Sequence, residues 1–317
     1  MMLFFVGRCC KSALSERGIL LQLRGDLYLL GAAFIWGTTF AFQVTGMEEL
    51  GPFGYAAARY LLGFFSVLAI WYGFRTRRAR ARAIGTYASG WKTGLAAGGI
   101  MFIATTLQQV GMTETTAGKT AFITALYIVL VPLGAVFLGR RIRRENWAGA
   151  GLAVVGLYLL SLHGSFSVAH GDVIIFISSF FWTAHILFVD RFAARVDAIE
   201  LSVAQIFVCT VGSIVLAALF ETVTAQALLH SWLPIFYGGV MSAGVAFTLQ
   251  ILGQQYAEPG PAAIIMSFES VFGALAGWLL LGEVLTRVEI MGCVLMFFGM
   301  IVTQAGLFRR QRRRGIA

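Results

Sequence analysis

The chain has 317 residues, long enough for two soluble domains, but it is 58% hydrophobic and only 12% charged. An ordinary soluble domain is about 25% charged, so this composition excludes a soluble protein and favours helices that face lipid. The net charge of +9 does not indicate nucleic-acid binding, because the arginines occur in short clusters between apolar runs of spanning length.

Ten apolar segments of membrane-spanning length are predicted. In chain order they cover residues 25–46, 51–73, 91–112, 116–138, 146–163, 171–190, 199–220, 231–256, 259–282 and 287–308. Short polar turns at 113–116 and 258–261 separate the third span from the fourth and the eighth from the ninth. The expected fold is therefore an all-α integral membrane protein with ten transmembrane helices.

Basic residues follow the second, fourth, sixth and tenth spans. The clusters are Arg75, Arg77, Arg78, Arg80 and Arg82; Arg140, Arg141, Arg143 and Arg144; Arg191 and Arg195; and Arg309, Arg310, Arg312, Arg313 and Arg314. A ten-span arrangement places all of them on one face, together with the basic N-terminal segment. Because short arginine-rich loops stay cytoplasmic, we predict a multi-pass inner-membrane protein whose basic tails, residues 1–24 and 309–317, are both cytoplasmic.

The second half of the chain repeats the first. The matched pairs are Gly25-Asp26 with Gly171-Asp172, Trp36 with Trp182, Ala58-Arg59 with Ala204-Gln205, and Leu107-Gln108 with Leu249-Gln250. The offset is 146 residues at first and slightly less later. Each repeat, 25–163 and 164–308, has five spans, and this odd number inverts the second repeat relative to the first. Inverted repeats pack around a midplane site in two nearly equivalent ways, which is the structural basis of alternating access.

Short motifs in both repeats are recognisable. They are Trp36-Gly37-Thr38-Thr39-Phe40, Phe53 to Arg59, Phe268-Glu269, and Leu281-Gly282-Glu283. Together they resemble the motifs of EamA-type transporters of the drug/metabolite transporter superfamily, over residues 25–308. The resemblance implies transport of amino acids, metabolites or xenobiotics, often coupled to protons. Two positions depart from the family pattern: Ser270 replaces a proline that kinks the ninth span, and Arg140 replaces a glutamate.

Arg59 and Glu269 are the charged candidates inside the spans. Arg59 lies about eight residues beyond Pro52, roughly 12 Å along the helix axis. Its guanidinium could bind a substrate carboxylate through two donors, or extend to the outer interface or a structural acid. Glu269 is a candidate for the cavity and for carrying a proton, since intramembrane carboxylates face the bundle interior. The alternative is helix packing, because Gly273 and Gly277 continue its stripe.

Uncharged side chains complete the expected site. The family resemblance implies a pocket between spans one, three, four, six, eight and nine. The predicted substrate-binding residues are Trp36, Thr39, Arg59, Gln108, Gln109, Tyr127, His185, Gln250 and Glu269. Hydrogen bonding between helices is the alternative role for each polar member, and for His185 the choice lies between a structural donor and a proton relay.

No catalytic residue, metal site or cofactor is predicted. The four cysteines have no metal-binding spacing, and Gly118-Lys119-Thr120 lacks the upstream glycine and the strand of a phosphate-binding loop. Without an ATP-binding loop, transport is expected to be driven by a gradient, with proton coupling as one option.

We therefore expect a secondary active transporter, operating as an exporter, for a small metabolite such as an amino acid. The alternatives are a flippase for a lipid-linked substrate and an intramembrane enzyme, although the sequence has neither His-x-x-x-His nor Gly-x-Ser-x-Gly. Paired glycines, Gly149 and Gly156 with Gly292 and Gly299, predict close packing of spans five and ten. That contact could be internal or between subunits, so both a monomer and a homodimer are considered.

Overall fold

The computed structural model describes residues 2–76, 87–115, 117–160, 169–281 and 286–316. Within these ranges the chain is helical apart from its turns, and the only β-type pairing there is an isolated bridge between Ala88 and Val196. The expectation of an all-α membrane protein is confirmed. The loop arginines at 77, 78, 80 and 82 and the Gly282-Glu283 pair lie outside the described residues, as do the side chains of residues 307–316.

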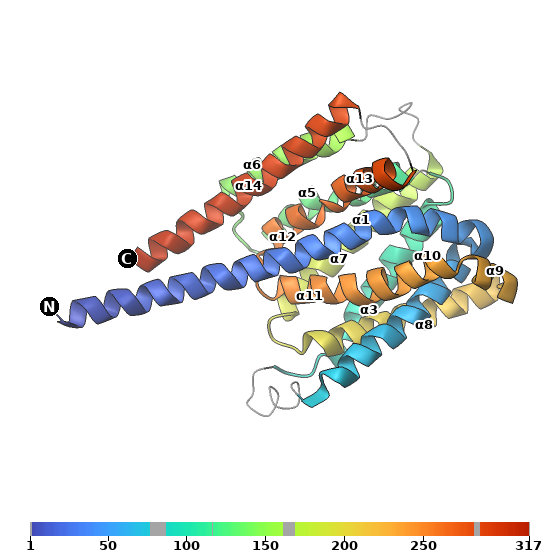
Figure 1. Ribbon diagram of the computed structural model, residues 1–317, viewed down its shortest axis with the longest axis horizontal. Coiled ribbons are helices and arrows are strands. Elements are labelled where there is room, and N and C mark those ends of the chain that lie inside the picture. The colour runs from blue at the N-terminus through green and yellow to red at the C-terminus, as the bar shows by residue number, and fades with distance from the viewer. Residues whose placement is uncertain (1, 77–86, 116, 161–168, 282–285, 317) are drawn as a thin grey trace.

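Helix α1 (Met2–Gly73) contains the first two predicted spans as two arms joined at Gly51. Gly51 has φ 70° and ψ 173°, a conformation that glycine adopts without the strain of a Cβ atom. Pro52 follows it and starts the second arm. We call residues 20–50 the first arm and 52–73 the second arm. Figure 1 shows the chain reversing between them, after the first arm has run the length of the molecule.

The remaining helices follow in the order of the predicted spans. They are α3 (Trp91–Gly111), α4 (Ala117–Thr124), α5 (Tyr127–Phe137), α6 (Arg144–Leu160), α7 (His170–Phe192), α8 (Ala198–Phe220), α9 (Ala225–His230), α10 (Trp232–Phe236), the π-helix η1 (Tyr237–Ala246), α11 (Phe247–Gln254), α12 (Pro259–Met266), α13 (Glu269–Leu281) and α14 (Arg287–Ile316). Among the described residues, seven stretches are long and apolar enough to cross a membrane, with both arms of α1 in one of them.

Two interrupted helices occupy equivalent places in the two halves. Helix α4 ends at Thr124 and α5 begins at Tyr127, whereas α12 ends at Met266 and α13 begins at Glu269, in both respects 142 residues later. Each junction tightens locally: the N–H of Leu126 bonds to the oxygen three residues earlier, as does that of Phe268, both at 3.2 Å. This tightening forms in the ninth span although the family's proline is replaced by Ser270.

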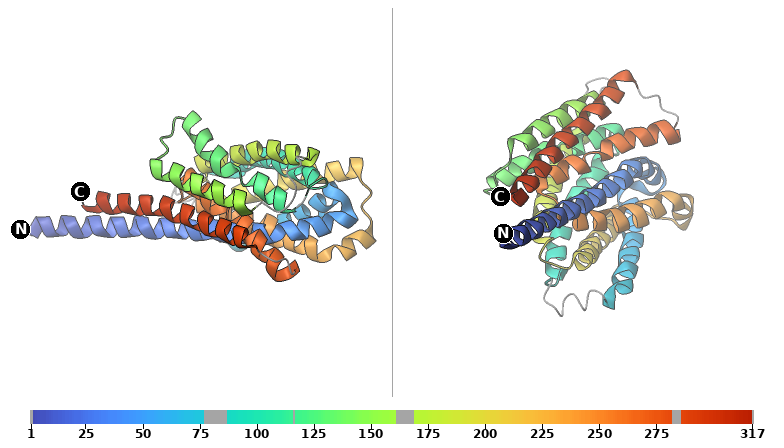
Figure 2. Two further views of the ribbon diagram at one scale, coloured as in Figure 1. Left: turned by 90° about the horizontal axis from the view of Figure 1, so that it is seen from above. Right: turned by 60° about the vertical axis from the view of Figure 1, so that its left-hand side comes forward.

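The paired glycines pack α6 against α14 within one chain. A Cβ atom on Gly149 would lie 2.6 Å from the carbonyl oxygen of Gly299, and one on Gly156 would lie 2.5 Å from that of Gly292. Small residues allow helix backbones to approach this closely in a membrane. Figure 2 shows the N-terminal part of α1 and the C-terminal part of α14 projecting side by side from the same end of the bundle.

Candidate substrate cavity

A cavity with about 530 Å³ of empty space lies among α1, α3, α4, α5, α7, η1, α11, α12 and α13. Six of the nine predicted site residues line it: Trp36, Arg59, Gln108, Tyr127, Gln250 and Glu269. The cavity therefore collects side chains from both halves of the chain, next to the two interrupted helices.

Aromatic rings form much of the wall. The Phe247 ring lies 5.0 Å from that of Trp36 and 6.0 Å from that of Trp182, and it stacks on Trp182 at an interplanar angle of 10°. Trp36 and Trp182 are the tryptophans matched by the internal repeat. The indole N–H of Trp182 donates to Oε1 of Gln108 at 3.1 Å, whereas the buried N–H of Trp36 has no hydrogen-bond partner. The two matched tryptophans thus differ in their hydrogen bonding.

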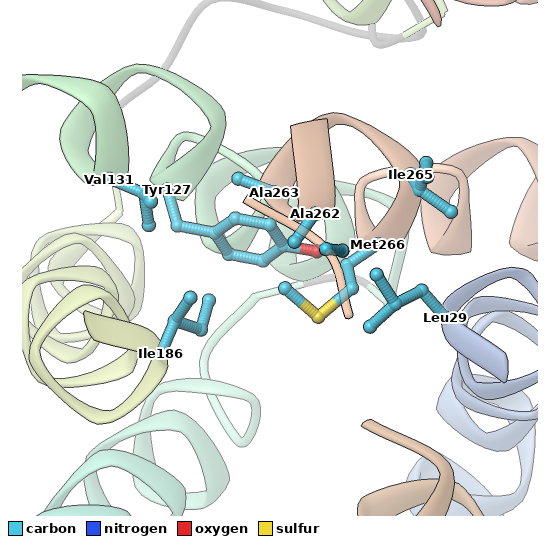
Figure 3. Close-up of a cluster of buried hydrophobic side chains, with 9 residues drawn as sticks. Leu29, Tyr127, Val131, Ile186, Ala262, Ala263, Ile265 and Met266 are labelled. Atoms are coloured by element: carbon cyan, nitrogen blue, oxygen red, sulfur yellow. The ribbon is translucent and has the colours of Figure 1, made fainter. Parts of the chain in front are cut away.

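Hydrophobic packing closes one side of the cavity. Tyr127, Ile186 and Met266 line the cavity and also belong to a buried cluster with Leu29. Figure 3 shows the Tyr127 ring pointing from its helix toward Met266, with Ile186 on one side. Leu29 precedes Trp36 by two helical turns on the first arm, so this cluster lies on the side of the cavity toward the termini.

Arg59 is 4% exposed and has no carboxylate within 4.0 Å in the described parts of the chain. Its Nη2 donates to the Tyr60 hydroxyl at 3.2 Å and to Oε1 of Gln109 at 3.3 Å, and its guanidinium lies 4.5 Å from the centre of the Tyr60 ring. Its Nε has no partner. An interfacial or acid-paired arginine, the alternative role considered from the sequence, does not match this environment.

Glu269 is the acidic residue of the cavity and is also 4% exposed. The Tyr127 hydroxyl donates to its Oε1 at 3.0 Å. Gly273, one turn later, packs on Gly37 of the first arm, where an added Cβ atom would meet the Glu269 carbonyl oxygen. The Glu269 side chain thus lines the cavity, while Gly273 on the same helix packs against the first arm.

Two matched glutamines of the cavity differ in their bonding. Nε2 of Gln108 donates to Oγ1 of Thr124 at 3.2 Å, and its Oε1 accepts from Trp182. Gln250, its counterpart in the second half, is 1% exposed, and its Oε1 has no partner. The cavity therefore offers a free acceptor at Gln250 as well as the Glu269 carboxylate.

Three predicted site residues lie outside the cavity lining. Thr39 donates to the carbonyl oxygen of Ile35 at 2.6 Å. Oε1 of Gln109 accepts the hydrogen bond from Arg59. Nε2 of His185, which is fully buried, lies 3.1 Å from Oε1 of Gln205. By the 146-residue offset, Gln205 is the counterpart of Arg59, so the second half has a neutral pair where the first half has a charged group.

Several lining residues were not predicted from the sequence: Phe40, Tyr60, Ile186, Ser242, Phe247 and Met266. Phe40 belongs to the first-span motif and Tyr60 is next to Arg59, so motif position could have indicated both. Ser242 lies in the π-helix η1. A π-helix changes which side chains face inward and often occurs at functional sites, but an apolar run gives no sign of that change.

The fold is that of a multi-pass helical membrane protein, and its cavity is lined by both charged and apolar side chains. The EamA-like transporter family model matches residues 23–162 and 169–304. The chain therefore belongs to the EamA-like transporter family and is a membrane transporter. The two matched segments correspond to the two predicted repeats.

Three relatives and one solved structure agree with this assignment. An uncharacterized transporter of Archaeoglobus fulgidus is 28% identical, covering 89% of this chain and 86% of the relative. A protein of Salmonella typhimurium named a probable amino-acid metabolite efflux pump is 24% identical, covering 92% and 97%. An uncharacterized inner membrane transporter of Escherichia coli is 24% identical, covering 91% and 94%.

One crystal structure has the same fold, with a TM-score of 0.73 at 19% sequence identity, and the match covers 90% of this chain and 98% of that one. The family and its named relatives are transporters, which confirms the interpretation of a transporter in preference to an intramembrane enzyme.

Proposed function

We propose that this transporter exports an amino acid or a related zwitterionic metabolite. The observation that carries the proposal is that one cavity contains both a buried arginine and a buried glutamate. The arginine has no acidic partner in the described chain. An unpaired buried charge is costly, so a ligand that neutralises it gains affinity. Nε of Arg59 and the N–H of Trp36 are the donors for a carboxylate.

Glu269 and Gln250 would receive the ammonium group of the same ligand. Both present acceptor oxygens, and both are buried, which strengthens their electrostatic interaction with a cation. The aromatic wall of Trp36, Trp182 and Phe247 suits an apolar or planar side chain, since aromatic contacts combine large buried area with preferred stacking geometry. An amino acid presents all three features in one small molecule.

Exchange with protons would follow if the substrate ammonium and a proton compete for the Glu269 carboxylate. A carboxylate that is protonated cannot pair with an ammonium group, so release of one cation accompanies binding of the other. This competition couples the outward movement of substrate to the inward movement of a proton without ATP. The hydrogen bond from Tyr127 to Glu269 holds the carboxylate toward the cavity for both ligands.

Alternating access would use ten helices arranged as two inverted five-helix repeats, residues 25–163 and 164–308. The constant offset between the interrupted helices α4–α5 and α12–α13 supports the repeat. The odd number of spans in each repeat supports the inversion, and the one-sided arginine clusters support cytoplasmic termini in the inner membrane.

A binding screen with matched analogues tests this proposal. Purified protein is heated with a series of amino acids, and with the amide and the N-acetyl form of each, while the midpoint of unfolding is measured. A ligand that binds the folded state raises that midpoint. We expect stabilisation by at least one free amino acid and its loss in both analogues, each of which removes one charge. Equal stabilisation by the amide or by the N-acetyl form would contradict the zwitterion proposal.

A further inference from the structure

Helix α7 is held by charge at both of its ends. At its beginning, Asp172 accepts a hydrogen bond from Thr115 at 2.5 Å and lies 3.4 Å from Nζ of Lys119. At its end, the carboxylate of Asp190, 6% exposed, lies 2.6 Å from Nη1 of Arg140. Thr115 precedes α4, Lys119 lies in its first turn and Arg140 follows α5, so α7 is fixed to the interrupted helix that packs along it.

The first arm of α1 is the counterpart of α7, at an offset of 146 residues. The position equivalent to Asp190 is Val44, which cannot form an ion pair. The position equivalent to Asp172 is Asp26, which accepts a hydrogen bond at 3.0 Å from Gln22 of its own helix. The first arm therefore has no acid at the position of Asp190, and its contact of this kind at that end is between Glu49 and His230 of α9, whose atoms lie 4.0 Å apart. At the near end, the Asp26 contact is made within its own helix.

The helix partners of the first arm also lack the necessary donors. At an offset of 142 residues, Thr115 corresponds to Ala257 and Lys119 corresponds to Pro261. Neither has a side chain that could donate to Asp26. The interrupted helix α12–α13 consequently has no charged connection of this kind to the first arm, although α4–α5 has two such connections to α7.

Backbone contacts between glycines replace these attachments on the first arm. A Cβ atom on Gly25 would lie 3.0 Å from the carbonyl oxygen of Gly253, and one on Gly37 would lie 2.8 Å from the backbone nitrogen of Gly273. Small residues allow this close approach. The Phe34 ring of the first arm also lies 5.3 Å from the Phe272 ring of α13, so the contact includes side chains, but among the described residues it contains no ion pair. One helix can shift along the other without breaking an ion pair.

Gly51 connects this arm to a fixed partner. The Glu221 carboxylate at the end of α8 accepts hydrogen bonds from the N–H groups of Phe53 and Gly54, at 3.1 and 2.5 Å. These bonds hold the start of the second arm. Gly51 lies immediately before Pro52 and this anchored turn, and its positive φ marks the break between the arms. Hinges are a few residues that absorb large changes of φ and ψ, and Gly51 is placed to act as one.

We propose that the first arm of α1, pivoting at Gly51, is the moving element of the conformational cycle, while α7 stays attached to α4 and α5. The two halves are thus unequal in mobility although they share one fold. Trp36, Phe40 and Gln43 of the first arm line the cavity. Movement of this arm therefore opens and closes the cavity directly.

Pulsed electron paramagnetic resonance on two matched label pairs tests the inference without requiring a known substrate. One pair joins Leu27→Cys, in the part of the first arm remote from Gly51, to Glu258→Cys at the start of α12. The control pair joins the corresponding places, Val173→Cys near the start of α7 and Glu114→Cys before α4. All four side chains are exposed. The native cysteines are first replaced, and the full chain is measured in lipid nanodiscs.

We expect the 27–258 pair to give at least twice the width of the distance distribution of the 114–173 pair, or two resolved populations. Equal widths, or a wider 114–173 distribution, would overturn the inference. Asp172→Asn, which keeps the side-chain volume, should widen the 114–173 distribution, and an unchanged width would show that the contacts of Asp172 do not restrain α7. Because this readout is independent of transport, it separates failure of this inference from failure of the proposed substrate.

Discussion

Tyr127 donates a hydrogen bond of 3.0 Å to Glu269, and each of these residues begins the second segment of an interrupted helix, at positions 142 residues apart. The two halves of the chain thus meet at the cavity through a pair of equivalent residues with different chemistry. One supplies a hydroxyl and the other a carboxylate. This contact places the single acidic group of the cavity wall between two elements that contribute to different repeats.

Replacing Tyr127 by phenylalanine should therefore lower the free energy of unfolding. The change leaves a buried carboxylate oxygen without its donor, which costs roughly 1–3 kcal/mol. Unfolding by heat or detergent denaturant measures this difference. Tyr72→Phe is the control, because that side chain is 60% exposed and should tolerate loss of its hydroxyl. Equal stability of the two variants would mean that the Tyr127 hydrogen bond does not contribute.

Glu269→Gln should remove the pH dependence of ligand binding. In the wild-type protein, acidification protonates the carboxylate that receives the ammonium group, so affinity should fall as the pH falls. Glutamine cannot be titrated and has no charge, so binding should be weaker at high pH and nearly constant across the range. Equilibrium binding of a stabilising amino acid at several pH values measures this. A variant that retains the wild-type pH profile would remove Glu269 from the proposed exchange.

Two neighbouring glycines of α6 should respond oppositely to the same substitution. Gly149→Ala places a methyl group against the Gly299 carbonyl and Thr303, and such overpacking typically costs about 1–3 kcal/mol. Gly151 has nothing within 4 Å of an added Cβ atom, so Gly151→Ala should leave stability unchanged or raise it through better helix propensity. Thermal unfolding of both variants decides the matter. A loss at Gly151 equal to that at Gly149 would contradict the observed packing.

The proposed topology can be tested by labelling single cysteines in intact cells. A cysteine at Arg141, in the arginine-rich turn after α5, should react with a membrane-impermeant reagent only after the cells are opened. A cysteine at Glu48, before Gly51, should react from outside. Both side chains are exposed. Reaction of both positions from the same side would contradict the inverted ten-helix arrangement.

Much of the helical framework could be predicted because apolar runs must form helices in lipid, where each backbone group is satisfied within its own segment. Arg59 and Glu269 were predicted as site residues because a charged side chain inside a membrane span is costly and usually faces the interior of the bundle. The bonding within the site could not be predicted. Gln109 accepts a hydrogen bond from Arg59 but does not line the cavity, whereas its neighbour Gln108 does.

Other features of the site depend on how the helices pack together, which a single sequence does not indicate. The π-helix η1 presents Ser242 to the cavity, and Phe247 lies between the two matched tryptophans. His185 was considered because a membrane histidine is unusual, but its position depends on Gln205 of the next helix. Such pairings arise between helices, and hydrophobic periodicity specifies only which segments form them.

In the proposed function, amino acids cross the membrane through the cavity that contains Arg59. Counterflow in proteoliposomes tests it most directly: vesicles loaded with an unlabelled amino acid are diluted into a trace of the labelled form, and its transient accumulation is measured. Wild-type protein should accumulate label, whereas Arg59→Lys, which keeps the charge but loses the guanidinium fork, should lose at least tenfold in initial rate at equal incorporation and stability. Arg59→Ala should show no accumulation above empty vesicles. Wild-type counterflow in Arg59→Ala would contradict the account.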